Sequence, residues 1–125
     1  MLLVESNIFI YAILPEHKKL LNWLVKQHFA VAETTLVEVL GFHRLPAEDA
    51  QSLEHLFNIA TILPMSRAIV DQAIALRQQR KMSLGDSLIA ATALDHGISL
   101  VTRNTSDFEW IESLVFEDVS HFFEN

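Results

Sequence analysis

The stretch that decides the fold is Ser83–Phe108, which reads SLGDSLIAATALDHGISLVTRNTSDF. Ser83 is of a residue type that caps helix N-termini, and Gly97 is of the type that most often follows a helix C-terminus, so we expect a helix that ends at His96. The apolar run Ile98–Thr102 then predicts a buried strand. A helix that leads straight into a buried strand is one unit of the alternating pattern of α/β folds.

The same alternation of short apolar runs and helical segments continues along the rest of the chain. Further strands are expected near residues 2–5, 29–32, 60–63 and 115–116, with helices over 7–28 (broken near Pro15), from Thr34 or Thr35 to about Arg44, from Pro46, and from Ser66 to about Lys81. Because the strands are apolar throughout, we expect a parallel sheet with helices on both faces. Ligand sites in such sheets lie at the carboxyl ends of strands, near a topological switch point.

Composition points to one domain over residues 1–125, because the chain has three Gly, three Pro and no internal linker or repeat. Half of the residues are hydrophobic, so we expect some apolar surface to meet a partner or a second copy. The absence of cysteine excludes disulfides and thiolate metal sites. No apolar run is long enough to span a membrane and no basic secretory signal begins the chain, so a cytoplasmic setting is expected.

The net charge of −7 argues against a general nucleic-acid binder, which would be basic. It leaves room for an enzyme that meets nucleic acid through a bound metal and a few basic residues. Candidates for such contacts are Lys18–Lys19, Arg77, Arg80–Lys81 and Arg103. The surplus of acid also suits capture of the protein by a basic segment of a partner.

Four acidic residues stand at the edges of apolar or small-residue segments that are far apart in sequence: Glu5, Glu38, Asp86 and Asp107. Glu5 ends the first expected strand, and Asp107 follows the strand Ile98–Thr102, so both lie where a site is expected. If the fold brings the four carboxylates together, they form an all-oxygen site of high negative charge. Such a site suits a hard cation such as Mg²⁺ or Mn²⁺.

Each of these acids also has an ordinary structural interpretation. Glu5 is the first polar residue after a strand, or a favourable charge near a helix N-terminus. Asp86 stands where a capping box with Ser83 would place an acid, and Asp107 lies in a polar turn. Glu38 fits the exposed stripe of an amphipathic helix, although a charge among apolar residues is costly unless it is paired or binds a metal.

Other kinds of site find less support. The six histidines show no metal-ligand spacing, and the sequence has no Gly-rich phosphate loop and no recognisable Ser–His or Cys–His nucleophile pair. A receiver-like phosphoacceptor is disfavoured, because no lysine follows a late strand and no paired acids follow the first. A metal site built from carboxylates is therefore the leading hypothesis.

These motifs, taken in order, resemble the PIN domain (PilT N-terminus), and in particular the single-domain VapC-type toxins of bacterial toxin–antitoxin pairs. The matching segments cover nearly the whole chain: Val4–Ala12, Thr35–Phe42, Leu84–Leu94, Gly97, Leu100–Asn104 and Asp107–Phe108. The resemblance implies a three-layer α/β/α fold with a mainly parallel five-stranded sheet. It further implies a Mg²⁺- or Mn²⁺-dependent ribonuclease that forms a homodimer and is held inactive by a small antitoxin protein.

By position, Glu38 and Asp86 match acids of the family directly. The fourth acid of the family varies in place within the loop after the fourth strand, where Asn104 and Asp107 are the candidates here and only Asp107 is charged. The first acid of the family is almost always Asp, whereas this chain has Glu5. The extra methylene moves the carboxylate by about 1.5 Å, and a misplacement of about 1 Å can cost on the order of 10²-fold in rate.

The resemblance also assigns supporting roles. Ser6 and Thr102 match hydroxyl positions beside the metal, and Asn7 matches a position that orders the site. Arg103 is a candidate for contact with a phosphate of the substrate, with a salt bridge to a neighbouring acid as the alternative. Two hypotheses follow: a metal-dependent endoribonuclease that is the toxin of a toxin–antitoxin pair, and a PIN-like interaction module with weakened or no nuclease activity because of Glu5.

Overall fold

The computed structural model describes residues 1–124. In chain order its strands and helices are β1 (Leu2–Val4), α1 (Ser6–Ala12), α2 (Lys18–Leu24), β2 (Phe29–Ala32), α3 (Glu33–Leu40), α4 (Ala47–Ile59), β3 (Thr61–Leu63), α5 (Arg67–Gln79), α6 (Leu84–His96), β4 (Ser99–Thr102) and β5 (Phe116–Asp118). Three short 3-10 turns are η1 (Pro15–His17), η2 (Thr105–Asp107) and η3 (Ser120–Phe123).

The five strands form one sheet in the order β3-β2-β1-β4-β5, and every neighbouring pair is parallel. The chain runs outward from β1 through β2 to β3 and then crosses back to β4 on the other side of β1. The carboxyl ends of β1 and β4 are therefore neighbours at the topological switch point, where parallel sheets bind ligands. This arrangement confirms the expected parallel sheet.

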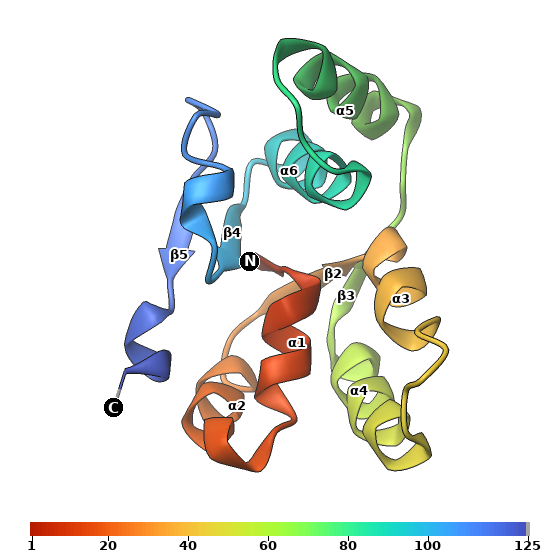
Figure 1. Cartoon of the computed structure of the whole chain (residues 1–125), viewed down its shortest axis with the longest axis vertical. Helices are drawn as coiled ribbons and strands as arrows, with labels where there is room; N and C mark the ends of the chain where they lie inside the picture. Colours follow the sequence, from red (N-terminus) through yellow and green to blue (C-terminus); the bar gives the residue numbers. More distant parts are fainter. Residues whose placement is uncertain (125) are drawn as a thin grey trace.

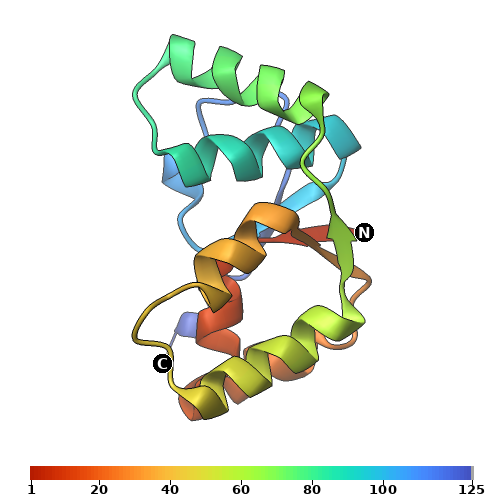
Figure 2. The same ribbon diagram turned by 90° about the vertical axis from the view of Figure 1, so that its right-hand side faces the viewer.

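Helices cover both faces of the sheet, which gives the three layers expected (Figures 1 and 2). Successive strand residues point to opposite faces, so Leu3 packs in the core under α5 and α6, while Val4 packs in the core under α1 to α4. In the second core the rings of Phe9 and Phe57 meet edge to face, with centroids 4.9 Å apart. The two cores fix the helices on which the candidate residues stand.

Helix α6 forms as its sequence predicts. The Ser83 hydroxyl accepts a hydrogen bond from the backbone N–H of Asp86 at 3.1 Å, and Gly97 ends the helix in the left-handed conformation with φ of 62°. Its buried residues include Ala90, Ala91 and Ala93, and small side chains let a helix approach its neighbours closely. The N-terminus of α6, with Asp86 in its first turn, is thereby anchored at a defined place.

The bounds of several other elements differ from the expectation. Neither Thr34 nor Thr35 caps α3, because β2 passes into the helix without a loop and Ala32 takes the N-cap position. The same helix ends at Leu40 and not near Arg44. Helix α1 already begins at residue 6, α2 ends at residue 24 instead of 28, and the last strand covers residues 116–118 instead of 115–116.

In the part of the chain that the structure describes, no helix has both the length and the apolar character that crossing a membrane requires.

Gly97→Ala is expected to lower the free energy of unfolding by about 1 kcal/mol, because an L side chain is strained in the left-handed region. A Cβ atom at this position would meet no other atom within 4 Å, so the loss reflects the backbone conformation alone. Urea denaturation measures it. Gly97→Asn is the matched control and should lose less, because Asn adopts this conformation more readily. Equal stability of Gly97→Ala and the wild type would contradict the explanation.

Candidate metal centre

Glu5 and Thr102 lie side by side where β1 and β4 end. The backbone N–H of Glu5 donates to the carbonyl of Val101 at 3.1 Å, which extends the pairing of the two strands by one residue. The Thr102 hydroxyl donates to Oε2 of Glu5 at 2.5 Å and accepts from the backbone N–H of Asn104 at 3.0 Å. Glu5 is only 8% exposed, so its carboxylate is buried at the expected edge of the sheet.

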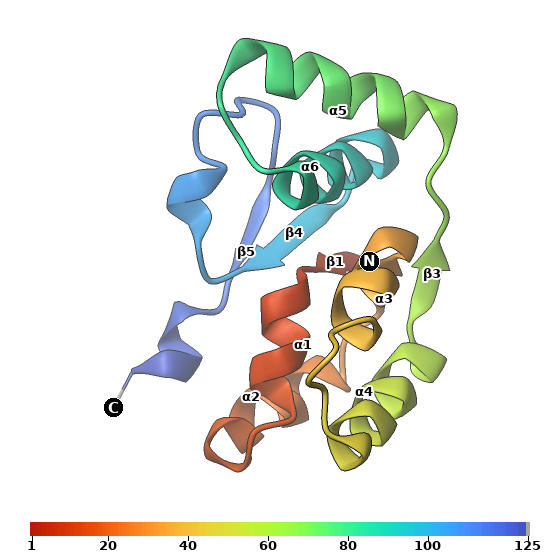
Figure 3. The same ribbon diagram turned by 45° about the vertical axis from the view of Figure 1, so that its right-hand side comes forward.

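Glu38 reaches the same region from α3, which lies between α1 and α6 (Figures 2 and 3). A Cβ atom built on Gly85 would lie 2.9 Å from Oε2 of Glu38. The Glu38 carboxylate therefore lies against the first turn of α6, at Gly85, the residue that precedes Asp86. The helix α3 presents Glu38 on its exposed side, as the ordinary interpretation expects, yet the carboxylate meets α6 through the space that Gly85 leaves open.

The pKa values of three of the acids show that the carboxylates share one electrostatic environment. Burial is the largest cause that raises the pKa of Glu5 above its ordinary value of 4.5. The hydrogen bond from Thr102 opposes this rise in pKa, whereas the negative charges of Asp86, Asp107 and Glu38 add to it.

The pKa values of Glu38 and Asp86 are raised in the same way. For Glu38 the partial desolvation of its carboxyl group is the largest cause, followed by the charge of Asp86. For Asp86 burial again comes first and the charge of Asp107 second, while a hydrogen bond with Ser83 lowers the pKa. Residues from four separate segments thus interact through their charges, as neighbouring carboxylates do.

The donor chemistry fits a hard divalent cation. Within residues 1–124 the salt bridge found is Arg67–Asp71 on α5, so the acids of the centre have no basic partner there. A buried carboxylate among other carboxylates is costly unless a cation compensates the charge. As their side chains are placed, no three acidic or histidine groups of the described chain are arranged to hold a metal ion. Binding one therefore requires the carboxylates to turn toward a common point.

The expected supporting residues come directly after β1 and β4 in the chain. Ser6 and Asn7 open α1 directly after Glu5, and neither side chain makes a hydrogen bond within the described chain. Asp107 ends η2 in the exposed loop after β4. Of the two candidates in this loop, Asp107 is the one whose charge acts on Glu5, whereas Asn104 supports Thr102 through its backbone.

Arg103 does not form the salt bridge to a neighbouring acid that was the alternative expectation for it, within the described chain. Its guanidinium carbon lies 4.2 Å from the centre of the Phe123 ring and 5.3 Å from that of Tyr11. This contact could not be predicted from the sequence, because the three residues are far apart in the chain and their types are ordinary for a surface or a core.

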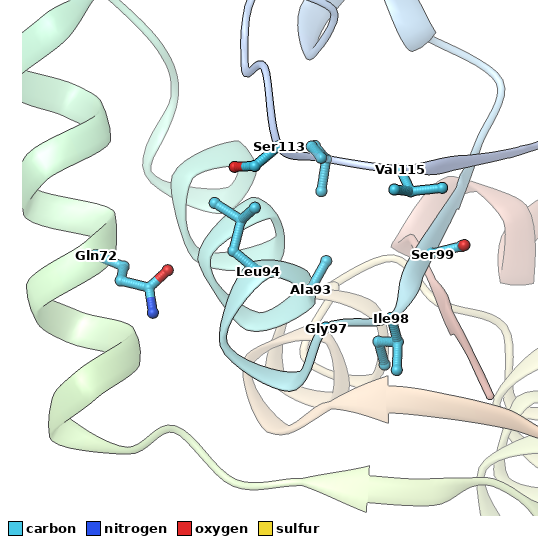
Figure 4. Close-up of a pocket in the computed structure, with 9 residues that line it drawn as sticks. Gln72, Ala93, Leu94, Gly97, Ile98, Ser99, Ser113 and Val115 are labelled. Atoms are coloured by element: carbon cyan, nitrogen blue, oxygen red, sulfur yellow. The ribbon is translucent and has the colours of Figure 1, made fainter.

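A hollow of about 410 Å³ lies at the opposite end of β4, between α6 and the segment before β5 (Figure 4). No acidic, basic or histidine side chain lines it; its lining residues are Gln72, Ala93, Leu94, Gly97, Ile98, Ser99, Ser113, Leu114 and Val115. It begins at the amino end of the strand whose carboxyl end carries Thr102, so it is separate from the acidic centre.

Thr102→Val is expected to weaken Mn²⁺ binding at neutral pH roughly 10-fold or more, the usual effect of removing a hydrogen bond that orients a metal ligand. The substitution keeps the shape of the side chain and removes the hydroxyl that donates to Glu5. Calorimetric titration with Mn²⁺ measures the affinity. Thr92→Val is the matched control, because Thr92 is also buried and donates only to the carbonyl of Leu88. Equal losses in the two variants would contradict the assigned role of Thr102.

The comparisons with known proteins agree with this geometry. The family model described as PIN domain matches residues 2–112. No curated protein is similar enough in sequence to match the chain. A chain of a solved toxin–antitoxin complex from Klebsiella pneumoniae is similar, with a TM-score of 0.73 and 29% identity over 92% of this chain and 96% of the other.

Two further solved structures share the fold at lower identity. A chain of VapBC2 from Rickettsia felis, solved bound to a DNA fragment from its promoter, has a TM-score of 0.77 and 23% identity, over 93% of this chain and 96% of that one. A chain of FitAcB from Neisseria gonorrhoeae has a TM-score of 0.75 and 20% identity, over 94% and 97% of the two chains.

Proposed function

The chain belongs to the PIN domain family, and on that premise we propose that it is a Mg²⁺- or Mn²⁺-dependent endoribonuclease that hydrolyses phosphodiester bonds of single-stranded RNA. The family membership and the three-layer fold that its motifs implied are confirmed. The proposal is supported mainly by one observation: the buried Glu5 carboxylate lies at the strand ends without a basic partner in the described chain, and the charges of Asp86, Asp107 and Glu38, from three other segments, raise its pKa.

In this proposal Glu5, Glu38, Asp86 and Asp107 hold one or two divalent ions. A bound ion of this kind supplies a water of lowered pKa for in-line attack and stabilises the leaving oxygen. Thr102 fixes the Glu5 carboxylate through its hydroxyl, and the backbone N–H of Asn104 fixes that hydroxyl in turn.

The loop and helix that border the centre have supporting roles. Ser6 and Asn7, at the start of α1, offer polar groups to the ligands of the ion or to the water. Arg103 follows Thr102 directly and offers a positive charge to a phosphate of the RNA.

The experiment is cleavage of single-stranded RNA by the purified protein with Mn²⁺ and with EDTA, beside Asp86→Asn. We expect cleavage with Mn²⁺ alone, and its loss in EDTA and in the variant. Asp95→Asn is the control, since it removes one negative charge from the same helix at the end that lies away from Asp86. Cleavage that survives both EDTA and Asp86→Asn would exclude the metal mechanism.

We further propose that a small antitoxin protein with a basic segment holds the enzyme inactive in the cytoplasm. The net charge of −7 supports a basic partner. An apolar groove of about 370 Å³ has Glu38 and Asp49 among its lining residues, and Phe42, also in its lining, is 55% exposed. This combination suits a segment that carries both apolar and basic side chains.

The partner proposal is tested by expressing the chain together with the protein encoded directly upstream of it, where a small DNA-binding protein with a basic tail is expected. Co-purification and loss of RNA cleavage would support the proposal. Cleavage that stays unchanged with excess of that protein would contradict it.

Light scattering on the isolated chain tests the proposed homodimer, which should have twice the mass of one 14.2 kDa chain.

The competing proposal is an interaction module that keeps the fold without useful nuclease activity. This proposal is based on Glu5, which occupies the position where the first acid of the family is almost always Asp. Glu5→Asp separates the two proposals. If the wild type is inactive and this variant cleaves RNA, the interaction module is correct. RNA cleavage by the wild type rules it out.

A further inference from the structure

Two aromatic side chains, Tyr11 from α1 and Phe123 from η3, lie against the guanidinium group of Arg103. The ring of His17 from η1 packs on both of them, and we call these three rings the aromatic cradle. None of the three had a role in the candidate metal centre. Arg103 itself follows Thr102, whose hydroxyl binds Glu5. The cradle therefore holds the positive charge of the residue that directly follows Thr102 in the chain.

The rings of the cradle support one another. The centroids of Tyr11 and Phe123 are 5.0 Å apart with an interplanar angle of 69°, and those of His17 and Phe123 are 5.0 Å apart at 59°. The first pair meets edge to face, which is a favourable arrangement of aromatic rings, and the second pair is tilted. The guanidinium carbon of Arg103 lies 4.2 Å from the Phe123 centroid, well inside the range of a cation–π contact.

The contacts leave the hydrogen-bonding edge of Arg103 available. A guanidinium group is planar and carries five N–H donors, which contacts between its central carbon and a ring do not use. In the described chain these donors make no hydrogen bond or salt bridge, and Arg103 is exposed. A planar fork of donors held in this way matches two oxygens of a phosphate group.

The last ring of the cradle comes from the end of the described chain. After β5 the chain turns toward α1 and α2 and forms η3 (Figure 1). In this turn Phe122 packs on Trp23 of α2, with centroids 5.6 Å apart, while Phe123 meets Arg103. The Phe122 ring attaches the turn to α2, and the Phe123 ring contacts Arg103, the residue that follows Thr102.

We propose that Tyr11 and Phe123 are positioning residues that hold the Arg103 guanidinium in place to bind a phosphate of single-stranded RNA, on a nucleotide that adjoins the scissile bond. The inference rests on the proposed ribonuclease function and deepens it. It makes the C-terminal turn part of the substrate site. Because the guanidinium is already held in place, less conformational entropy is lost when RNA binds.

The test is steady-state cleavage of a short fluorescent single-stranded RNA with Mn²⁺, and the decisive readout is KM against kcat. Phe123→Leu is expected to raise KM about two- to fivefold, the size of an exposed cation–π contact, with kcat nearly unchanged. Phe123→Tyr should restore the wild-type KM, because it keeps a ring. Arg103→Gln should raise KM roughly tenfold or more, since it removes hydrogen bonds from a charged donor.

Two comparisons separate positioning from a general structural effect. Phe122→Leu is the matched control, because it removes the neighbouring ring of the same turn without touching Arg103. In the double variant Arg103→Gln/Phe123→Leu, KM should equal that of Arg103→Gln alone, because the ring acts only through the guanidinium. Independent, multiplying effects of the two substitutions would overturn the inference.

The outcomes also separate this inference from the proposed function. If the wild type cleaves RNA and Phe123→Leu has the same KM as the wild type, the cradle has no positioning role and the ribonuclease function stands. If KM rises equally in Phe122→Leu and Phe123→Leu, the turn acts only through folding and the inference is wrong. If the wild type cleaves no RNA with either metal, the proposed function fails, and this inference fails with it.

Discussion

Asp86→Asn is expected to reduce Mn²⁺-dependent RNA cleavage more than about 100-fold, because loss of a metal ligand should exceed the 10- to 100-fold cost of losing an outer partner. The same change should make the metal-free protein more stable near neutral pH. Asp86 acts on the pKa of both Glu5 and Glu38, so its removal relieves repulsion between carboxylates. Steady-state cleavage and urea denaturation in EDTA measure the two effects.

The sign of the pH dependence follows from the raised pKa values of Glu5, Glu38 and Asp86. Above the ordinary values of 4.5 for Glu and 3.8 for Asp, the folded chain holds more protons than the unfolded chain at these groups. Their contribution to stability is therefore fully present below those values and is lost as the pH rises through the raised values.

The difference between the wild type and Asp86→Asn isolates this contribution. The pKa of Asp118 is lowered by its hydrogen bonds with Ser120, which gives a pH dependence of the opposite sign, but both proteins share it. We expect the advantage of Asp86→Asn in free energy of unfolding to grow from pH 4 toward pH 7. An advantage that shrinks over this range would show that Asp86 does not repel its neighbours.

Gly85→Ala is expected to lower Mn²⁺-dependent cleavage about 100-fold, the cost of misplacing a catalytic group by about 1 Å. The new methyl group would lie 2.9 Å from Oε2 of Glu38, and the carboxylate must move to avoid it. Because this carboxylate is the free end of a flexible side chain, the fold itself can adapt. Alanine also favours a helix over glycine, so the free energy of unfolding should not fall.

Gly97→Ala is the matched control for this prediction, because it makes the same substitution at the other end of α6. There stability should fall and cleavage should persist, which is the opposite pattern. Wild-type cleavage by Gly85→Ala would show that the position of the Glu38 carboxylate is not needed. A large loss of stability in Gly85→Ala would show that the activity loss reports on folding.

Much of the fold was predictable because its signals are local. Ser83 and Gly97 mark the two ends of α6 in the sequence, and the apolar run at residues 29–32 is a strand with the expected bounds. The start of α3 was not predictable from its threonines, because the direct passage from β2 into the helix depends on how the sheet places the chain.

In the candidate site, too, some contacts could be predicted from the sequence and others could not. The proximity of Glu5 to the end of β4 was predictable, because ligand sites of parallel sheets lie at the carboxyl ends of the strands. The approach of Glu38 to Gly85 and of Phe123 to Arg103 did not follow from any pattern, because each joins residues distant in sequence whose types carry no signal of pairing. Such contacts appear only when the helices are packed.

The central claim is that the four carboxylates form one centre for a divalent ion, and a titration with Mn²⁺ followed by electron paramagnetic resonance tests it most directly. At neutral pH the wild type should bind Mn²⁺, and Asp86→Asn and Glu5→Gln should each weaken that binding more than about tenfold. Asp95→Asn should bind as the wild type does. Equal Mn²⁺ binding by the wild type, Asp86→Asn and Glu5→Gln would contradict the claim.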